Sequence, residues 1–542
     1  KYRTGENGAI VSNQFADADL NYWVDGAGTY LSRSDWEATY PVEQTTVEAT
    51  PEMMNILAGE WYEKPEGAPS YSEVAANFGV DSGLNLAMMK DVPLSDHETW
   101  LKFIYQLQPE DLPNATAESF QSPAVGDLSP AFAVGDGCDS VGGTYPLTVE
   151  FNGEQVNPVT TRYCSNVILA GTFNADLYAG RGTMMGEDGM WSGYMINYNL
   201  GNDLHRTPFG GRNFEYISED PYLTGWISAV QILGMEKSDV TGTIKHFATN
   251  NQEHRRHFVE SVVSERALRE IYLRGFEIAV KEGHARSIMT SYNPLNGYWT
   301  ASNYDLVTTI LRGQWCYTGI VMSDWWAEGN VRDGAGSTKH VAAMVRAQND
   351  VFMVVTDPEH NSGSDDLAVA LTEGRLIRGE LQRSAANICR FLLQTPAFRR
   401  SIGRTTALDA QLEAMAEQDM QQAAQNGQPL TLHGYVSIDP AAIDNGYRRT
   451  TAFCVMVEQG GAYTLHLRCR AMPGNSPLAQ IPVSIFAGRV FVKTITITGA
   501  QTDWCEFTAA LPAVDAGEVF YLRFYFGQSG MELDAVTLDL LS

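Results

Sequence analysis

The middle of the chain alternates short apolar runs with amphipathic segments. Gly242–Phe247, Ala285–Asn293 and Gly319–Trp325 each pass from small or apolar residues into polar ones. Between these runs, apolar side chains recur at helical spacing. Strands that alternate with helices and end in polar residues are typical of a parallel sheet, whose strands present chemistry at their carboxyl ends. We therefore predict an α/β fold, a (β/α)8-type (TIM-like) barrel, over residues 88–400.

Capping residues indicate where several of these helices begin. Ser95 or Asp96 precedes one segment with helical spacing, and Ser264 precedes another. Ser302–Asp305 has the form of a capping box, and its helix is expected to stop at Gly313.

The period of the pattern changes near residue 400. A polar helix over residues 408–426 lies in a predicted helical linker, 401–430, and a jelly-roll-like all-β sandwich is predicted for 431–542. Residues 1–87 are interpreted as an extended lead-in that wraps the barrel. A sandwich of this kind can bind glycans or support a catalytic domain, and its fold alone does not decide between them. Its expected strands are Tyr463–Cys469, Val490–Ile497, Val519–Phe526 and Glu532–Leu540.

Charge and composition exclude several classes of partner. The 542 residues contain 65 acidic and 37 basic side chains, a formal net charge of -28. Such a field repels nucleic acids and anionic membranes. No run of about 18 apolar residues is present, so neither a membrane span nor a leader is expected. The acidity favours a secreted or surface location only weakly, and the location stays unassigned.

The cysteines do not form a metal-binding pattern. There are seven, with no Cys-x-x-Cys pair and no His/Cys cluster, so no zinc site or other cofactor is predicted. The odd count leaves at least one free thiol in a monomer, and the redox compartment stays open.

Asp324 is the first candidate for chemistry. It follows the apolar run Gly319–Met322 and precedes Trp325 and Trp326. Indole rings offer flat apolar area on which a sugar face can stack, which indicates a carbohydrate site with Asp324 as its reactive carboxylate. The alternative is that a strand-terminal Asp caps the next helix, and the isolated tripeptide does not choose between them.

Further candidates are cationic. Arg206 and Arg212 lie in a loop rich in Gly and Pro, where a guanidinium can grip vicinal hydroxyls or orient a carboxylate. Lys245 and His246 are adjacent at a strand end, where both can reach one ligand because the backbone turns. For His246 alone, a satisfied core histidine is the more common case. Asp136 lies in a tight turn that exposes its carboxylate.

Five motifs in register resemble those of the β-glucosidase type of glycoside hydrolase family 3. The resemblance covers roughly residues 88–400. It is carried by Gly211–Glu215 with Ser218–Tyr222, Lys245–Phe247 with Asn250–Glu253, Ser291–Asn293 with Asn296 and Gly297, and Val321–Trp325, with Asp136 preceding them.

The resemblance implies a retaining exo-β-glycosidase, most simply a β-glucosidase, with Asp324 as nucleophile. Flanking cations are expected to keep the pKa of Asp324 low and the carboxylate ionised. A glycoside is the implied substrate, and no metal or cofactor is implied. The substrate-binding residues would be Asp136, Arg206, Arg212, Lys245, His246, Met289, Tyr292 and Trp325.

The sequence departs from the family pattern at the second carboxyl group. Retention needs an acid about 5 to 5.5 Å from the nucleophile. In two-domain members that acid is a Glu on a separate α/β sandwich, and none follows residue 400. Tyr30–Glu37 resembles the linker of members with inverted domain order, so this chain is expected to be the C-terminal part of a longer polypeptide. The acid would then come from a domain or companion chain absent here.

Members with a barrel alone, the N-acetylhexosaminidase type, use a Lys-His-Phe-Pro-Gly-His-Gly motif. This chain has Lys245–Asn250 instead, although His254 and His257 follow and could act as substitutes. Two other functions stay open: a β-xylosidase on the same scaffold, and a glycan-binding subunit that is inactive alone. A homo-oligomer is equally open.

Overall fold

In the computed structural model the chain forms two compact units, Lys1–Ala407 and Leu408–Ser542. The described residues are 77–93, 96–108, 134–141, 160–330, 336–353, 365–395, 398–399 and 405–541 apart from 489, with residues 51 and 111 and the strand backbones of 149–151 and 154–156. Most of the predicted lead-in, including Tyr30–Glu37, lies outside them.

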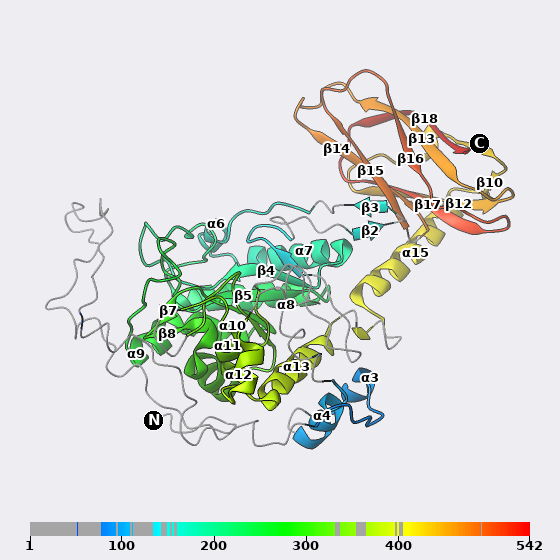
Figure 1. Cartoon of the computed structure of the whole chain (residues 1–542). Helices are drawn as coiled ribbons and strands as arrows, with labels where there is room; N and C mark the ends of the chain where they lie inside the picture. The colour runs from blue at the N-terminus through cyan, green and yellow to red at the C-terminus, as the bar shows by residue number, and fades with distance from the viewer. Residues whose placement is uncertain are drawn as a thin grey trace, which may run out of the picture. The chain divides into compact units, whose positions relative to one another are not determined.

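A parallel sheet forms the centre of the first unit. Its strand order is β1-β4-β5-β6-β9, and every pairing between neighbours is parallel. A single bridge from Met322 to Val351 extends it. The α/β class is confirmed, but the described strands form an open sheet rather than a closed barrel (Figure 1). The strands are β1 (Val134–Asp136), β4 (Ile196–Gly201), β5 (Thr241–Phe247), β6 (Ser287–Thr290) and β9 (Ile320–Met322).

Two hydrophobic clusters bury the two faces of this sheet. Successive side chains of a strand point to opposite faces, so Ile288 and Met289 of β6 enter different clusters. Val321 and Met322 of β9 divide in the same way. Burial on both faces explains why these strands read as continuous apolar runs instead of alternating ones.

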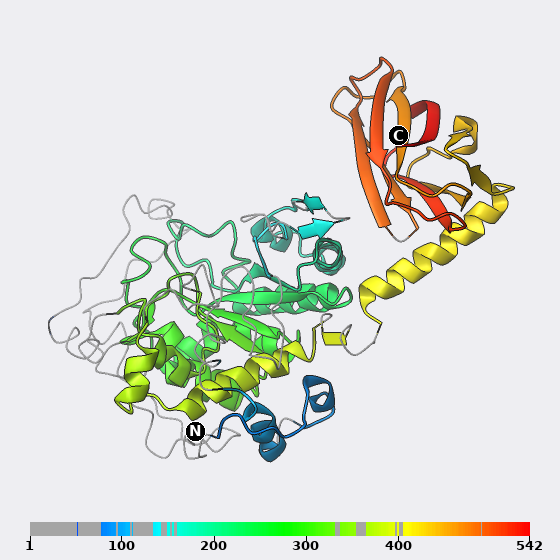
Figure 2. The same ribbon diagram turned by 45° about the vertical axis from the view of Figure 1, so that its right-hand side comes forward.

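Helices α7 (Ala175–Ser192) and α8 (Pro221–Glu236) lie side by side along the sheet (Figures 1 and 2). Their backbones approach so closely that a Cβ on Gly234 would lie 2.8 Å from the backbone nitrogen of Thr183. Glycine is therefore required there. The remaining helices of this unit are α3 (Leu86–Met89), α4 (His97–Ile104), α6 (Asn166–Ala170), α9 (Glu265–Ala267), η2 (Leu268–Tyr272), α10 (Arg274–Lys281), η3 (Thr300–Ser302), η4 (Asp305–Gln314), α11 (Val341–Ala347), α12 (Leu367–Thr372) and α13 (Arg378–Leu392).

The structure confirms two predicted caps and corrects a third. Asp96 accepts from the backbone nitrogen of Thr99 at 3.1 Å, and Ser264 accepts from that of Ala267 at 3.3 Å. In the predicted capping box the cap is the side chain of Asn303, since Ser302 bonds to Asn330 instead. This helix, η4, also runs one residue beyond Gly313. Two short antiparallel pairs complete the described pairings of this unit: β2 (Val149–Phe151) with β3 (Glu154–Val156), and β7 (Pro294–Leu295) with β8 (Tyr298–Trp299).

The second unit starts with helix α15 (Ala407–Gln425) and continues as two β-sheets around one hydrophobic cluster. The four predicted strands are all present. Apart from the parallel pair β10 and β12, neighbouring strands are antiparallel. The five-stranded sheet is β10 (Leu430–Leu432), β12 (Arg449–Val457), β17 (Val519–Phe526), β14 (Gln480–Ala487) and β15 (Val490–Thr498); the four-stranded sheet is β11 (Tyr435–Ile438), β18 (Met531–Leu540), β13 (Tyr463–Ala471) and β16 (Cys505–Ala510), and a short helix η6 (Pro440–Ala442) follows β11.

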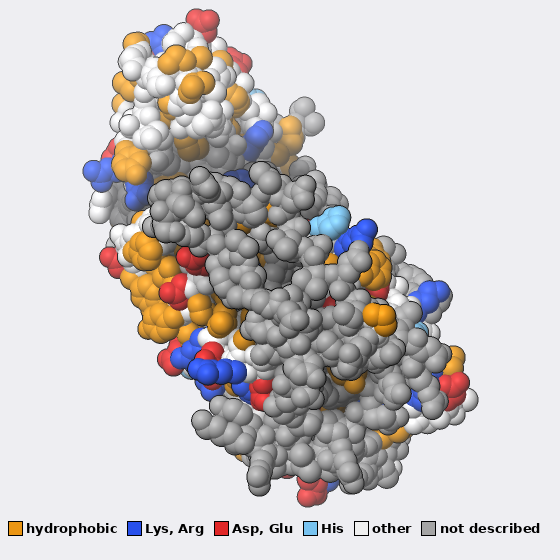
Figure 3. Space-filling model, turned by 90° about the vertical axis from the view of Figure 1, so that its left-hand side faces the viewer, with side chains coloured by type: hydrophobic (Ala, Val, Ile, Leu, Met, Phe, Trp, Pro, Cys, Tyr) orange, Lys and Arg blue, Asp and Glu red, His pale blue; other side chains and the backbone are white. Residues whose placement is uncertain are grey.

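Surface charge is mixed despite the large negative total. On the face in Figure 3, Lys and Arg side chains lie among Asp and Glu side chains. Within the described residues, no helix has the length and apolar character needed to cross a bilayer.

Candidate active site

A cavity of about 340 Å³ lies where the carboxyl ends of the parallel strands meet. Because the strands are parallel, residues near the ends of β1, β5 and β6, and residues that follow β6 and β9, are brought to one edge of the sheet. The lining residues are Asp136, Arg212, Lys245, His246, Arg256, His257, Met289, Tyr292, Asp324, Trp325 and Trp326.

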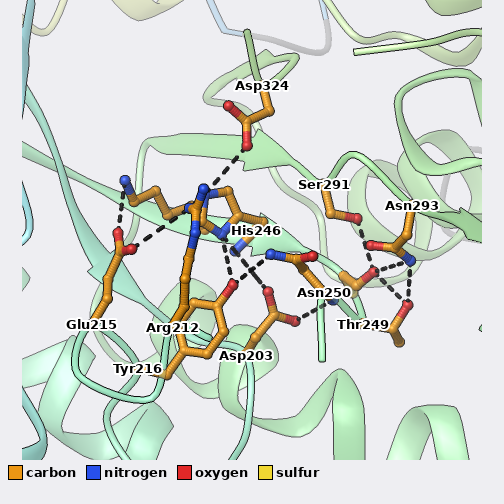
Figure 4. Close-up of polar contacts among 12 residues, drawn as sticks. Asp203, Arg212, Glu215, Tyr216, His246, Thr249, Asn250, Ser291, Asn293 and Asp324 are labelled. Atoms are coloured by element: carbon orange, nitrogen blue, oxygen red, sulfur yellow. Dashed lines mark hydrogen bonds and ion pairs between the residues drawn. The ribbon is translucent and has the colours of Figure 1, made fainter. Parts of the chain in front are cut away.

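Asp324 lies two residues beyond the end of β9 and is only 4% exposed. Its Oδ1 accepts from the backbone nitrogen of Trp325 at 2.7 Å, and its Oδ2 lies 3.4 Å from Nε2 of His246 (Figure 4). No helix begins in the described residues 325–330. The helix-cap interpretation of Asp324 is therefore wrong, because the turn at this position aims the carboxylate into the cavity.

The predicted low pKa of Asp324 is also wrong. Burial raises the pKa of this carboxyl, and the nearby Arg212 and Lys245, which favour the ionised form, do not outweigh it. The sequence identified the cations but could not show that the carboxyl group is so completely removed from water.

Lys245 joins two carboxylates beside Asp324. Its Nζ lies 2.9 Å from Oε1 of Glu215 and 3.6 Å from Oδ1 of Asp136. Burial opposes the charge on Lys245, but these two carboxylates raise its pKa and keep it protonated. Burial likewise opposes ionisation of Glu215. The neighbouring cations Lys245 and Arg212 outweigh burial and lower the pKa of Glu215 below its usual value. Glu215 belongs to the motif Gly211–Glu215, but it was not predicted as a site residue.

His246 is held as a neutral ring. Burial lowers its pKa far below the usual value, and the cations Arg212 and Lys245 act in the same direction. Nη1 of Arg212 lies 2.8 Å from Nε2, and a guanidinium only donates, so Nε2 accepts and the ring proton is on Nδ1. Nδ1 faces the hydroxyl of Tyr216 at 3.1 Å.

A buried aspartate supports the end of β5, which carries His246, and the loop that follows it. Oδ2 of Asp203 accepts from the backbone nitrogen of His246 at 3.1 Å, and Oδ1 accepts from that of Asn250 at 3.2 Å (Figure 4). Burial raises the pKa of Asp203 to about 7, although backbone donors oppose the shift. Asp203 was missed by the sequence argument because the register that aligns β4 with β5 was not predictable from the pattern.

Arg256 is a further lining residue that the sequence argument missed, whereas Trp326, named beside Trp325 as a stacking ring, lines the cavity as expected. The guanidinium of Arg256 lies 4.1 Å from the ring centroid of Tyr292, and the ring of His257 lies 4.4 Å from it. Glu253 accepts from Arg256 at 2.7 Å and pairs with Nε of Arg212 at 3.0 Å, so one carboxylate orients two guanidinium groups. Arg255 and Arg256 are adjacent, and the sequence offered no signal to choose between them.

The structure brings together all the predicted site residues except Arg206. Arg206 is exposed, and its guanidinium stacks on the ring of Tyr272 at 5.5 Å. The two loop arginines thus differ because the turn at Gly210 and Gly211 separates them. Of the two histidines considered as substitute acids, His257 lines the cavity and His254 is exposed.

Among the described residues that line the cavity, only Asp136 and Asp324 carry carboxyl groups. Asp136 pairs with Lys245. The described residues contain no group of three or more His, Cys, Asp or Glu side chains that could hold a metal ion.

Known proteins are similar in sequence to the part of the chain that forms this site. Residues 146–391 match the family model for the glycosyl hydrolase family 3 N-terminal domain. A beta-glucosidase of Ruminococcus albus is 41% identical over 373 residues, 69% of this chain and 38% of the relative. Thermostable beta-glucosidase B of Acetivibrio thermocellus is 43% identical over 159 residues, 29% of this chain and 21% of the relative.

A solved structure extends the similarity to most of the chain. The crystal structure of a beta-glucosidase from Paenibacillus barengoltzii aligns with a TM-score of 0.53 and 30% identity, over 94% of this chain and 53% of its own. The matched family segment contains every cavity residue except Asp136. Residues 146–391 are thereby assigned to the N-terminal domain of glycoside hydrolase family 3. It spans 38% of the Ruminococcus relative and 53% of the Paenibacillus one.

Proposed function

We propose that the protein is a retaining exo-β-glycosidase of the β-glucosidase type, in which Asp324 forms a glycosyl-enzyme with the nonreducing-end sugar. One observation carries the proposal: Asp324 is a buried carboxylate that shares its cavity with Arg212, Lys245 and His246. A site of this size fits one sugar ring, and its polar groups suit neutral hydroxyls. The names of the relatives support glucose as the sugar.

The cavity residues divide the work of the first step. Oδ2 of Asp324 attacks the anomeric carbon while its Oδ1 stays bonded to Trp325 N–H. Lys245 and Arg212 donate to sugar hydroxyls, and Asp136 accepts from them. Nε2 of His246 accepts from Arg212 and so holds that guanidinium in place, and the hydroxyl of Tyr292 donates to Asp324. Met289 and Trp325 form apolar walls against the faces of the ring.

We extend the proposal to the domain plan. Residues 1–87 serve as a lead-in that wraps the catalytic domain, and the parallel sheet closes into a (β/α)8-type barrel within 88–400. Residues 401–430 form a linker, and 431–542 form a jelly-roll-like sandwich. The parallel pairing of the described strands and the 94% coverage by a beta-glucosidase structure support this plan.

Covalent labelling tests the nucleophile directly. A 2-fluoro-β-glucoside with a good leaving group should inactivate the chain and leave a fluoroglucosyl group on the peptide that contains Asp324, since the fluorine slows hydrolysis of the intermediate. Peptide mass spectrometry after proteolysis identifies the site. A label on Asp136, or on any other carboxylate, would overturn the assignment.

We further propose that the acid is supplied by a domain or companion chain outside this one. The carboxylate of Asp136 forms an ion pair with Lys245. Apart from Asp324, no other described lining residue has a carboxyl group that could protonate a leaving oxygen. The chain purified alone should then cleave a dinitrophenyl β-glucoside, whose leaving group needs no proton, about 10²-fold or more faster than an alkyl β-glucoside. Comparable rates in steady-state assays would place the acid within this chain.

A further inference from the structure

Two cysteines of the second unit lie directly opposite each other on neighbouring antiparallel strands. Cys469 of β13 pairs with Cys505 of β16 in the register of the four-stranded sheet. Cα atoms of directly opposite residues in such a pair are about 4.5 to 5.5 Å apart. A disulfide needs Cα atoms about 4.4 to 6.8 Å apart, so the backbone already meets the main geometric requirement.

Both side chains point into the interior of the sandwich. Alternate residues of β13 are buried, and Cys469, with no exposed surface, continues that buried series. The neighbouring pairs Leu467 with Phe507 and Leu465 with Ala509 face the same hydrophobic cluster. Because the side-chain period of a strand is two, Cys505 shares the face of Cys469.

The two thiols differ in access to solvent. Cys469 is buried, and burial, with the adjacent Cys505, raises its pKa to about 12. Cys505 is the first residue of β16 and is only half-buried. Its Sγ donates to the carbonyl oxygen of Asp503 at 3.5 Å and lies 4.0 Å from the side-chain nitrogen of Gln501. Reagents therefore reach Cys505 first.

We propose that Cys469 and Cys505 are a redox-modification site, which a low-molecular-weight disulfide such as oxidised glutathione converts into a cross-strand disulfide. The Cys505 thiolate attacks one glutathione sulfur and releases one glutathione thiol. The Cys469 sulfur, giving up its proton, attacks Sγ of Cys505 and releases the second. Two protein thiols are oxidised, one glutathione disulfide is reduced, and both protons end on glutathione.

The position of the pair gives this bond a structural consequence. β16 is the edge strand of its sheet, and the bond fixes it to β13. The chain between Cys469 and Cys505 contains β14 and β15, which belong to the other sheet. The closed loop therefore spans both sheets, and its closure restricts the unfolded chain. An edge strand fixed in this way is also less available for pairing with another chain.

The experiment uses the full chain, equilibrated with reduced or with oxidised glutathione and then alkylated. Non-reducing peptide mapping should find the peptides of Cys469 and Cys505 linked only in the oxidised sample, with the loss of two hydrogen atoms. The thermal midpoint of the second unit should rise by roughly 5 to 10 °C on oxidation.

Two variants control for other effects. Cys505→Ser should remove both the link and the rise in the thermal midpoint. Cys454→Ser, which changes another partly buried cysteine of the same unit, should keep both. A glutathione adduct that persists on Cys505, a link to a different cysteine, or no change after equilibration with the oxidant would each overturn the proposal.

Discussion

Asp324→Asn is expected to reduce kcat by at least about 10³-fold on any β-glucoside, because no neighbouring group can replace the attacking carboxylate. His246 accepts through Nε2 but is itself bonded to Arg212, and Asp136 is paired with Lys245. Steady-state kinetics of the purified variant measure the loss. Asp220→Asn is a suitable control, since Asp220 is exposed and only caps α8.

The same variant should remain folded. Burial raises the pKa of Asp324 in the native state, so its contribution to the free energy of unfolding is fully present below its unfolded pKa and is lost as pH rises through the folded pKa. The Asn side chain is neutral at every pH, so the variant does not lose stability by burying an ionised group at this position. The thermal midpoint of Asp324→Asn relative to wild type should therefore increase from acid to neutral pH. A lower midpoint at neutral pH would show that the activity loss reflects damage to the fold.

The raised pKa also fixes one feature of the activity profile. The acid limb of kcat/KM reports the ionisation of the free enzyme's essential carboxylate. We expect this limb above the ordinary carboxyl range near pH 4, and we expect it to be absent from the residual activity of Asp324→Asn.

Lys245→Met is expected to cause the second largest loss. The substitution removes the only described cation within 4 Å of Asp136. Glu215 keeps one ion-pair partner, Arg212, whose Nη1 lies 3.6 Å from Oε2 of Glu215. Removing one partner of a buried ion pair costs about 3–5 kcal/mol, because the carboxylates stay buried without compensation. The thermal midpoint should fall by roughly 10 °C, and kcat/KM by about 10²-fold or more, because the sugar loses a charged donor.

A second substitution separates these two effects. In Lys245→Met with Glu215→Gln, the buried charge of Glu215 is removed together with its partner. The thermal midpoint should recover in large part, while kcat/KM should stay low because the donor to the sugar is still missing. If activity recovered with stability, Lys245 would be a purely structural residue.

Sequence reasoning succeeded where a residue's role depends on its position at a strand end. The carboxyl ends of parallel strands converge whatever the remaining details, so the predicted strand ends at Lys245, His246 and Asp324, together with the family resemblance, indicated one shared site. It failed for Arg206, because a Gly-containing turn separates two arginines only six positions apart. It also missed Arg256 and Asp203, whose contributions depend on which loop faces the cavity.

The pairing of Cys469 with Cys505 in the second unit could not be predicted from the sequence for a similar reason. The period-two pattern placed Tyr463–Cys469 on a strand, but pairing that strand with β16 requires the register between segments 36 positions apart at Cys469 and Cys505. Registers are set by packing of the whole face against the other sheet, which no local window contains.

By itself the sequence determined the elements and their order: parallel strands alternating with helices, then an antiparallel β-unit, with Asp324 at the end of a buried strand. These follow from local periodicity and capping, which act over a few residues. Only the tertiary structure decided the direction in which the pKa of Asp324 is shifted and which residues line the cavity around it. The pKa of Asp324 depends on the water that the surrounding chain excludes, and the set of groups around it depends on contacts between residues distant in sequence.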